Sequence, residues 1–436
     1  TISIADADKG FKVLQGSELT ITPIVDSFLE TSYSWQINGE DISNELTCTL
    51  PTIELGEYQV RFATHNEDGD DEVTFKVEVC SPDQVDFNWT FLQTEYNMSA
   101  GRTIRIKPVD VNNALDAVYT WTVDNEQVQS GENDTYLFTS EQQGEHTVKV
   151  EMKNSYILAT QTLKVNVCPP AGTYQRKISA TSSASMNKVY EYLPAPGQFI
   201  NENHNTITMA EACTYAEERI NQTAYVSLGG FGGYIIVGFD HSIVNDGDYN
   251  IAITGNAFDG SSEPGIVWVM QDENGDGLPN DTWYELRGSE YGKAETWQDY
   301  AVTYHKPTGI QLPTPWTDNH GQSGSIDYLG AFHRQDYYYP AWVKEKQYTL
   351  RGTRLKERNY DQSGNGTYWV NDSYEWGYAD NFSAIDRLTD DDNYNAGPSD
   401  NHFKISHAVT FDGKDANLKY VDFIKVQVGV NSKSGW

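Results

Sequence analysis

Apolar and polar residues alternate along short runs in the first 168 residues, with turn-forming residues between the runs. A strand with one buried face shows this alternation, because successive side chains point to opposite faces of a sheet. In the first half of this region the runs cover residues 18–24, 33–37, 57–62 and 73–79. Their spacing is typical of a β-sandwich. We therefore expect one sandwich over residues 1–80 and another over 81–168.

The two segments repeat one another. The matching pairs are Tyr33-Ser-Trp35 with Tyr119-Thr-Trp121, Gly56-Glu57 with Gly144-Glu145, and Val77-Glu-Val-Cys80 with Val165-Asn-Val-Cys168. The offset is 86 residues for the first pair and 88 for the other two. A nearly constant offset indicates that one domain is present twice. We expect each tryptophan to fill the core between two sheets.

The pattern changes after Cys168-Pro-Pro, a stiff and turn-prone boundary. We expect a larger β domain over residues 171–436, because short apolar runs recur at 225–239, 249–255, 266–270, 283–286 and 418–431. The run at 225–239 predicts two strands around a glycine turn. The best helix candidate is 208–221, where Thr208 is followed three residues later by Glu211, the capping-box spacing.

A calcium-type loop stands between the runs at 266–270 and 283–286. Asp272, Asn274 and Asp276 alternate and are followed by Gly277, which is the first half of an EF-hand calcium loop. The Leu278 carbonyl is a further ligand candidate, and Asp281 and Glu285 are the carboxylates nearest to the missing twelfth-position ligand, where Trp283 stands. No helix pattern flanks the loop. We expect a structural Ca²⁺; the alternative is a solvated hairpin tip.

Residues from about 290 to 400 form a long insertion with little periodicity and many aromatic residues. Segments of this length in compact domains carry function or are disordered, and aromatic content argues against disorder. Flat rings beside polar groups suit ligands with both apolar faces and hydroxyls. The candidate ligand-binding residues are Trp297, Trp316, Asp318, His320, Tyr337, Tyr338, Trp342, Trp369 and Trp376. The alternative is that these rings build local cores. A second acidic cluster, 386–392, is either a solvated loop or another cation site.

Charge and composition exclude several classes of partner. The formal net charge is -33 and the pI is near 4.4, whereas nucleic acids and anionic membranes attract Lys and Arg. Abundant Tyr, Trp, Asn, Gly and Thr are typical of secreted β-proteins. Four cysteines without metal-ligand spacing are too few for a disulfide framework. We expect a secreted or surface-displayed monomer, with any signal and anchor outside this sequence.

The Tyr-x-Trp strand and the Gly-Glu strand of each repeat resemble PKD-like and immunoglobulin-like spacer domains of bacterial surface proteins. The stretches IIVGFD, YNIAITGNAF, EPGIVWVMQD and WYEL, with the closing LKYVDFIKVQVGVN, resemble galactose-binding-like jelly rolls of the discoidin and carbohydrate-binding-module group. The whole arrangement is similar to PKD-containing surface lipoproteins of gut anaerobes. That resemblance implies presentation at the extracellular face of an outer membrane, beside a nutrient transporter.

No local catalytic motif is present: the sequence has no Gly-x-Ser-x-Gly, no His-Glu-x-x-His and no Walker loop. We expect a non-catalytic binding protein that captures a glycan or another nutrient for uptake, with cobalamin capture as an alternative. A glycan-active hydrolase is a further alternative, because its two acids need not be near each other in sequence. The last alternative is an adhesion or scaffold protein.

Overall fold

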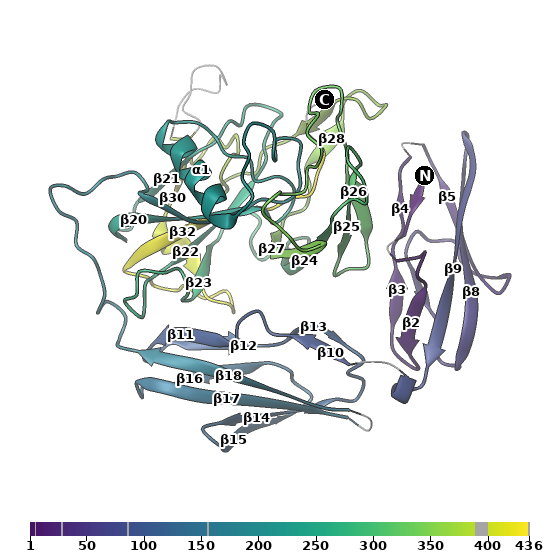
Figure 1. Cartoon of the computed structure of the whole chain (residues 1–436), viewed down its shortest axis with the longest axis horizontal. Helices are drawn as coiled ribbons and strands as arrows, with labels where there is room; N and C mark the ends of the chain where they lie inside the picture. The colour runs from purple at the N-terminus through teal and green to yellow at the C-terminus, as the bar shows by residue number, and fades with distance from the viewer. Residues whose placement is uncertain (5, 28, 85–86, 155–156, 389–399, 435–436) are drawn as a thin grey trace. The chain divides into compact units, whose positions relative to one another are not determined.

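Figure 1 shows the computed structural model, which describes all residues except 5, 28, 85–86, 155–156, 389–399 and 435–436. The described chain is mostly β and contains one α-helix, as expected. It divides into two compact units. Unit 1 comprises Thr1–Pro170 and Thr317–Gly324, and unit 2 comprises Ala171–Trp316 and Ser325–Trp436. No disulfide bond joins the four cysteines, all of which lie in the described chain.

The first sandwich of unit 1 contains a five-stranded sheet in the order β2-β9-β8-β5-β6 and the pairs β3-β7 and β1-β4. The core lies between the large sheet and the β3-β7 pair, and Trp35 is completely buried within it. The strands are β1 (Ile2–Ser3), β2 (Phe11–Leu14), β3 (Leu19–Ile21), β4 (Ile24–Val25), β5 (Ser32–Ile37), β6 (Glu40–Ser43), β7 (Cys48–Leu50), β8 (Gly56–Asn66) and β9 (Gly69–Cys80).

The second sandwich, which follows the 3-10 helix η1 (Pro82–Gln84), repeats this plan. Its large sheet has the order β11-β18-β17-β14-β15, with the pairs β12-β16 and β10-β13. Trp121 occupies the core as Trp35 does in the first sandwich. The strands are β10 (Asn88–Thr90), β11 (Glu95–Ser99), β12 (Thr103–Ile106), β13 (Val109–Asn112), β14 (Val118–Val123), β15 (Glu126–Gly131), β16 (Tyr136–Thr139), β17 (Gly144–Lys153) and β18 (Leu158–Cys168).

The repeat seen in the sequence is therefore a repeat of structure. Gly56 and Gly144 begin equivalent strands with φ angles of 148° and 124°, a backbone region that favours glycine. Cys80 and Cys168 end equivalent strands and are both buried. Each of these last strands pairs in parallel with an early strand of its own domain, β2 in the first and β11 in the second.

Unit 2 is built on a six-stranded sheet in the order β19-β20-β32-β22-β23-β31. Its strands are β19 (Lys188–Leu193), β20 (Tyr234–Val244), β32 (Tyr420–Val428), β22 (Gly265–Met270), β23 (Trp283–Leu286) and β31 (Ala408–Val409). The closing strand β32 lies between β20 and β22, so the chain's last segment completes the middle of the sheet.

One face of this sheet, the apolar face, carries Val237, Val267, Val269, Ile424 and Val426. It packs against the antiparallel pair β21 (Ile251–Thr254) and β30 (Asp400–Phe403), and against helix α1 (Met209–Asn221). The 3-10 helix η2 (Ile405–His407) follows β30. This packing buries the main core of unit 2.

Helix α1 begins at the capping box expected from the sequence. The Thr208 hydroxyl accepts a hydrogen bond from the Glu211 backbone N–H at 3.2 Å, and the Glu211 carboxylate accepts one from the Thr208 N–H at 3.1 Å. Ala212 and Ala216 form the buried side of the helix. No helix in the described chain is long and apolar enough to cross a membrane.

Residues 290–400 contain more regular structure than the sequence pattern suggested. They form a four-stranded sheet in the order β26-β25-β24-β27, from β24 (Trp297–His305), β25 (Thr314–Asp318), β26 (Ser323–Ile326) and β27 (Gln347–Arg354), and a hairpin of β28 (Asn359–Asp361) and β29 (Trp369–Asn371). The interpretation of this segment as lacking periodicity was wrong for β24. Tyr300, Val302 and Tyr304 alternate there and are buried.

The predicted strand before the glycine turn is also wrong, because residues 225–233 have no strand and only β20 follows. The turn instead brings two backbone segments very close together. A Cβ atom at Gly229 would lie 1.9 Å from the Ala195 carbonyl oxygen, so only glycine fits there.

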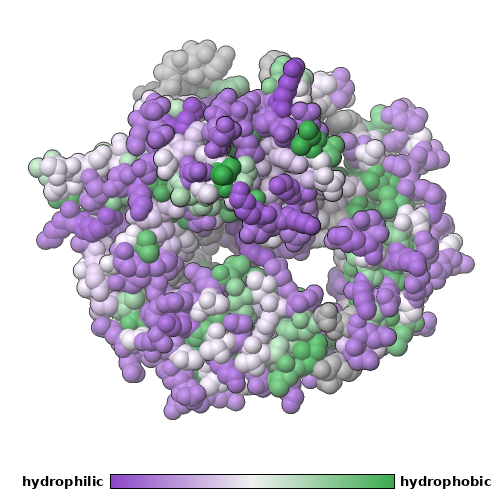
Figure 2. Space-filling view, in the orientation of Figure 1, coloured by the Kyte–Doolittle hydropathy of each residue, from purple (hydrophilic) through white to green (hydrophobic). Residues whose placement is uncertain are grey.

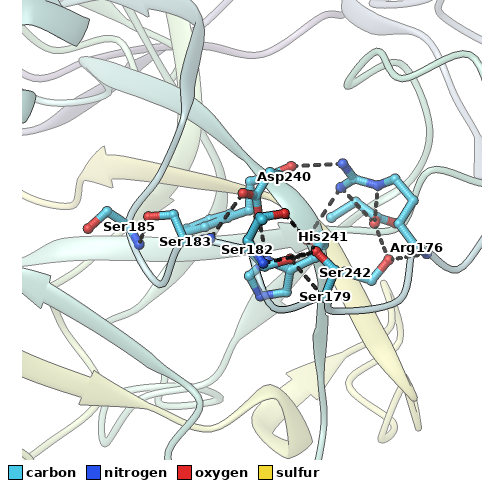
Figure 3. A network of polar contacts seen from close by, with 11 residues as sticks. Arg176, Ser179, Ser182, Ser183, Ser185, Asp240, His241 and Ser242 are labelled. Atoms are coloured by element: carbon cyan, nitrogen blue, oxygen red, sulfur yellow. Dashed lines mark hydrogen bonds and ion pairs between the residues drawn. The ribbon is translucent and has the colours of Figure 1, made fainter.

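Polar contacts attach the segment after residue 170 to β20, as Figure 3 shows. The Arg176 backbone N–H donates to the Ser242 hydroxyl at 2.9 Å, and its guanidinium donates to the Phe239 carbonyl at 2.7 Å. Asp240 accepts from the Ser183 N–H at 3.0 Å and pairs with His241 at 2.7 Å. The face of the molecule that Figure 2 shows carries mostly hydrophilic residues, with scattered hydrophobic ones.

Candidate functional site

The loop between β22 and β23 is closed by the side chain of its first acidic residue. Asp272 accepts hydrogen bonds from the Gly275 N–H at 2.8 Å and the Gly277 N–H at 3.0 Å. Both glycines have positive φ angles, 77° and 75°, so they permit the sharp turn that the motif predicts. The Asp272 N–H donates to the buried Asp422 carboxylate at 2.8 Å, which fixes the start of the loop to β32.

Three polar side chains gather at the tip of the loop. The Asp276 carboxylate accepts from the Asn274 amide at 2.9 Å and from the Asn280 amide at 2.8 Å, and the two amides lie 3.3 Å apart. Asp276 also accepts from the Leu278 N–H at 2.8 Å. Asn280 was not among the predicted ligands. Counted from Asp272 it stands at the ninth position, which in EF-hand loops supplies a ligand, often through a water, so the spacing of the motif could have found it.

Two acidic side chains are buried behind this tip, Asp281 at 5% exposure and Glu273 at 4%. Among the described residues, the Glu273 backbone N–H is the one donor near the Asp281 carboxylate, and neither Asp281 oxygen makes a close hydrogen bond. Burial raises the pKa of Asp281 to about 8, the Glu273 backbone N–H lowers it, and the carboxylates of Glu273, Asp272 and Asp276 raise it further. The region is therefore rich in oxygen atoms and poor in positive charge.

Glu285 is placed away from this loop, although the sequence grouped it there. Its carboxylate accepts a hydrogen bond from the Thr353 hydroxyl of β27 at 2.7 Å, and its backbone pairs with Trp268. Among the described residues, no group of three His, Cys, Asp or Glu side chains is positioned to hold a metal. Any cation at the loop would therefore need asparagine oxygens as well as carboxylates.

Glu285 instead belongs to a row of residues on the second face of the six-stranded sheet. Paired residues on neighbouring strands point to the same side of a sheet. The pairs Glu191–Ile236, Ile236–Lys425, Lys425–Trp268 and Trp268–Glu285 continue across β19, β20, β32, β22 and β23. Tyr234 and Trp283 stand two residues from members of this row, and so also face this side. We call Glu191, Tyr234, Trp268, Trp283, Glu285 and Lys425 the polar face.

Lys425 lies at the centre of the polar face with three aromatic rings around it. Its ammonium nitrogen is 4.9 Å from the ring centroids of Trp268 and Trp283 and 5.9 Å from that of Tyr234. Aromatic ring faces attract cations at these distances. Burial lowers the pKa of Lys425 to about 8, and the carboxylates of Glu191 and Glu285 act against that change.

The polar face is only partly covered. Thr353 and the Arg351 carbonyl of β27 contact Glu285 and Gln427, and Leu355, Tyr374 and Tyr378 pack beside Ile266 and Trp268. Glu191, Tyr234, Trp268, Trp283 and Lys425 remain half-buried. The arrangement thus offers aromatic surface, an ammonium group and a carboxylate together.

Most of the aromatic residues predicted to bind ligand build cores. Tyr338 and Trp342 are 1% and 6% exposed, and the Trp342 indole N–H donates to the Tyr192 carbonyl at 3.0 Å. Trp297, Trp316 and Tyr337 pack against the core beneath the four-stranded sheet. The two other rings, Trp369 on β29 and Trp376 beside the His407 ring, are half-buried.

Of the two polar candidates, Asp318 is the last residue of β25 and His320 lies in the turn between β25 and β26. The Asp318 carboxylate accepts from the His320 N–H at 2.9 Å and the Gln322 N–H at 2.7 Å, which shapes the turn. His320 is exposed. In the acidic cluster 386–392, Asp386 is buried and accepts from the Gly377 N–H at 2.6 Å, while 389–392 lie outside the described residues.

A shallow groove of about 560 Å³ lies on the first sandwich, over β5, β8 and β9. Its charges are satisfied locally. Arg61 is paired with Glu72 at 2.5 Å, and His65 with Asp70 at 2.6 Å. The groove therefore has fewer charged groups available to a ligand than the polar face has.

The comparisons with known proteins concern the N-terminal region. Residues 1–66 and 91–154 match the model of the PKD-like domain. No curated protein matches the chain. Solved structures with similarity include the fibronectin(III)-like modules of Clostridium thermocellum CbhA, at 15% identity over 41% of this chain and 100% of that one, with a TM-score of 0.20.

A chimeric titin Z1Z2 is 21% identical over 36% of this chain and 92% of its own, with a TM-score of 0.22. The N-terminal four Ig domains of a Dscam1 isoform are 14% identical over 38% and 45%, with a TM-score of 0.17. TM-scores this low carry no argument. The family match falls on both N-terminal sandwiches, so these two domains are PKD-like.

Proposed function

We propose that this protein is a non-catalytic binding protein of the cell surface, in which unit 2 captures a glycan on its polar face and the PKD-like domains serve as spacers. The observation that carries the proposal is the half-buried group of Tyr234, Trp268 and Trp283 around Lys425. Domains of the PKD-like and immunoglobulin-like type are typical of binding and scaffold modules, which agrees with this role.

The chemistry of the polar face suits a sugar. A sugar ring has apolar C–H faces that stack on aromatic rings, and hydroxyl groups that both donate and accept hydrogen bonds. Trp268 and Trp283 supply the rings, Lys425 supplies a donor, and Glu191 supplies an acceptor. The Glu191 carboxylate already accepts from the Tyr234 hydroxyl at 2.7 Å, so its orientation is fixed before any ligand arrives.

The two carboxylates of the polar face support capture more than hydrolysis. Glu191 and Glu285 stand on strands four positions apart in the sheet order, so their backbones are separated by about 19 Å at roughly 4.8 Å per strand. Paired acids of glycoside hydrolases stand roughly 5–10 Å apart. Each carboxylate is also engaged by a hydroxyl, Glu285 by Thr353.

The test is a titration of the full chain with a panel of soluble glycans and cobalamin, followed by calorimetry and tryptophan fluorescence. Trp268 and Trp283 lie in the proposed site, so ligand contact would change the emission directly. We expect saturable binding of a glycan, and a loss of affinity of about tenfold or more in Trp283→Ala and in Lys425→Met, since tenfold corresponds to about 1.4 kcal/mol.

The matched control is Trp369→Ala, which removes a half-buried tryptophan from the β28–β29 hairpin. It should bind as the unaltered protein does. If only this variant loses affinity, the ligand lies on the insertion and the polar face is the wrong site. If cobalamin is the only compound that binds, the ligand is a corrinoid and the glycan proposal is wrong. If no compound of the panel binds, an adhesion or scaffold role is favoured.

The cellular setting belongs to the same proposal. A capture protein of this kind would be secreted or displayed at the extracellular face of an outer membrane, and would pass its ligand to a transporter there. Surface labelling of intact cells, with an inner-membrane protein as the control, tests the location. Labelling only after lysis would contradict it.

A further inference from the structure

His146 stands on β17 at a position where the second sandwich buries side chains. His146, Val148 and Val150 are buried on the same face of this strand, and only 7% of His146 is exposed. The Phe138 ring of β16 lies 5.6 Å from the imidazole, measured between ring centroids. A polar side chain at a buried position needs hydrogen-bond partners, because burying it without them is costly.

Both ring nitrogens of His146 face oxygen atoms. Nδ1 lies 2.7 Å from Oδ2 of Asp124, and Nε2 lies 2.9 Å from the Gln142 carbonyl oxygen. A carbonyl oxygen and an ionised carboxylate accept hydrogen bonds but do not donate them, whereas a neutral imidazole has only one N–H. Both hydrogen bonds therefore form only when the ring carries two protons, as an imidazolium.

The carboxylate that faces His146 also holds a tight turn. Asp124 and Asn125 form the two-residue connection between β14 and β15, with φ angles of 50° and 72°, as in a type I′ turn. Oδ1 of Asp124 accepts from the Thr147 N–H at 2.9 Å, and the Asp124 N–H donates to the Thr147 carbonyl at 2.9 Å. The imidazolium thus joins the β14–β15 turn to the start of β17.

The first sandwich has the same contacts with its backbone but a different pair of side chains. Asn38 stands where Asp124 does, and its side-chain oxygen accepts from a backbone N–H of β8 at 2.9 Å. Tyr58 stands where His146 does, and its hydroxyl donates to the Glu54 carbonyl at 2.9 Å. An amide and a phenol therefore hold the same backbone in one repeat that a carboxylate and an imidazole hold in the other. The fold itself does not require the charged pair.

We propose that His146 and Asp124 form a pH-dependent clamp in the second sandwich, which holds the β14–β15 hairpin on β17 in acid and loosens as the medium becomes alkaline. The first sandwich, where Tyr58 and Asn38 stand instead, should not respond in this way. The two PKD-like domains would then differ in the conditions under which they are stable, although they share one fold. The clamp is independent of the ligand proposed for unit 2.

The groups that face the ring set the direction of the pH dependence. The Gln142 carbonyl raises the pKa of His146, burial lowers it, and the Asp124 carboxylate raises it again, so that the pKa lies above 6.5. Among the described residues, Asp124 is the charged group in contact with the ring, because β16 presents Phe138 there and β18 pairs Val165 with His146.

The sign of the effect follows from these shifts. Because the folded chain binds the His146 proton more tightly than the unfolded chain does, the stability from the clamp is fully present below pH 6.5. It is lost as the pH rises through the raised pKa of His146. The Thr147 N–H and then His146 lower the pKa of Asp124, so its contribution is present above pH 3.8 and is lost only in stronger acid.

The first experiment is an NMR titration of the full chain labelled with ¹⁵N in its histidine rings. The chain has nine histidines, and the resonances missing in His146→Gln identify those of His146. At neutral pH both ring nitrogens of His146 should show the chemical shifts of a protonated ring, with a titration midpoint above the ordinary value of about 6.5. A midpoint at or below that value would overturn the proposal.

The second experiment is hydrogen exchange of the full chain at pH 6 and pH 8.5, read by mass spectrometry and corrected for the intrinsic exchange rate. Peptides over 118–131 report on the clamped hairpin, and peptides over 32–43 report on the equivalent hairpin of the first sandwich. Protection of 118–131 should be about tenfold lower at pH 8.5, the change expected for loss of one hydrogen bond to a charged group. Protection of 32–43 should change much less, and equal changes in the two hairpins would contradict the clamp.

Two reciprocal double variants decide the assignment. Asp124→Asn with His146→Tyr gives the second sandwich the residues of the first, and should remove the pH dependence of 118–131. Asn38→Asp with Tyr58→His gives the first sandwich the charged pair, and should create a pH dependence in 32–43. A pH dependence that persists in the first double variant would overturn the proposal. Should that variant fail to fold, the absence of any gain in the second would do the same.

Discussion

Removal of the Asp422 carboxylate should destabilise unit 2 more than any other single polar change near the loop. Asp422 is completely buried on β32 and receives four hydrogen bonds. They come from Arg176 at 3.0 and 3.3 Å, from the Ser242 hydroxyl at 2.6 Å and from the Asp272 N–H at 2.8 Å. The residue thus joins the segment after residue 170, β20 and the β22–β23 loop.

The size of this loss in stability depends on which hydrogen-bond donors can bond to water once the carboxylate has been removed. The Arg176 side chain is 39% exposed, so water can replace part of its lost bond. Ser242 and Asp272 are buried at 1% and 5%, so their donors would remain without acceptors. A hydrogen bond to a charged group contributes about 1.5–3 kcal/mol, so Asp422→Ala should cost about 3–6 kcal/mol. Asp422→Asn keeps one acceptor oxygen and should cost about half as much.

The assay is urea unfolding followed by tryptophan fluorescence. Ser242→Ala, which removes one of the donors to this carboxylate, should cost about 1.5–3 kcal/mol. Asp240→Ala is the control, because that carboxylate is 33% exposed and pairs with His241 at the surface, where such pairs contribute about 1 kcal/mol or less. A loss below about 1 kcal/mol for Asp422→Ala, or equal losses for the Ala and Asn variants, would refute the reasoning.

Three further predictions concern the core, the helix and pH. Trp121→Ala should cost about 3–5 kcal/mol in urea unfolding of unit 1, because it empties a completely buried site; a loss below 2 kcal/mol would contradict this. Thr208→Ala should cost about 1 kcal/mol, since it removes one half of the capping box, and Thr208→Ser should restore most of the loss. Burial raises the pKa of Glu285 from 4.5 to about 7, so the folded chain holds that proton more tightly than the unfolded chain does. The stability that this bound proton contributes is fully present below pH 4.5 and decreases by about 3 kcal/mol as the pH rises to 7. The free energy of unfolding should therefore differ less between pH 5 and pH 8 for Glu285→Gln than for the unaltered protein. An unchanged difference would refute this role of Glu285.

Local patterns in the sequence were sufficient for the elements whose structure is decided locally. Alternating runs around Trp35 and Trp121 predicted both sandwiches, because a half-buried strand shows its period in the sequence. Thr208 and Glu211 predicted the start of α1, because both partners of the capping box lie within one helical turn. The spacing of Asp272, Asn274 and Asp276 predicted a sharp acidic turn for the same reason.

The sequence pattern was less informative where several functions share one residue type. Tyrosine and tryptophan suit both a binding surface and a core, so Trp342 was a reasonable candidate for ligand contact. Its burial depends on α1 and Tyr192, which are more than 100 residues away in sequence. Only the packing of distant segments distinguishes the two roles.

The polar face was decided by tertiary structure alone. Glu191, Trp268, Glu285 and Lys425 are spread over more than 230 residues of sequence, and no short-range pattern connects them. They meet because β32 pairs with both β20 and β22, and because the register of those pairs sets one residue opposite another. A shift of one residue would turn Lys425 toward the apolar face. The sequence by itself determined the strands, the repeat and the acidic turn, while strand register determined which side chains stand together.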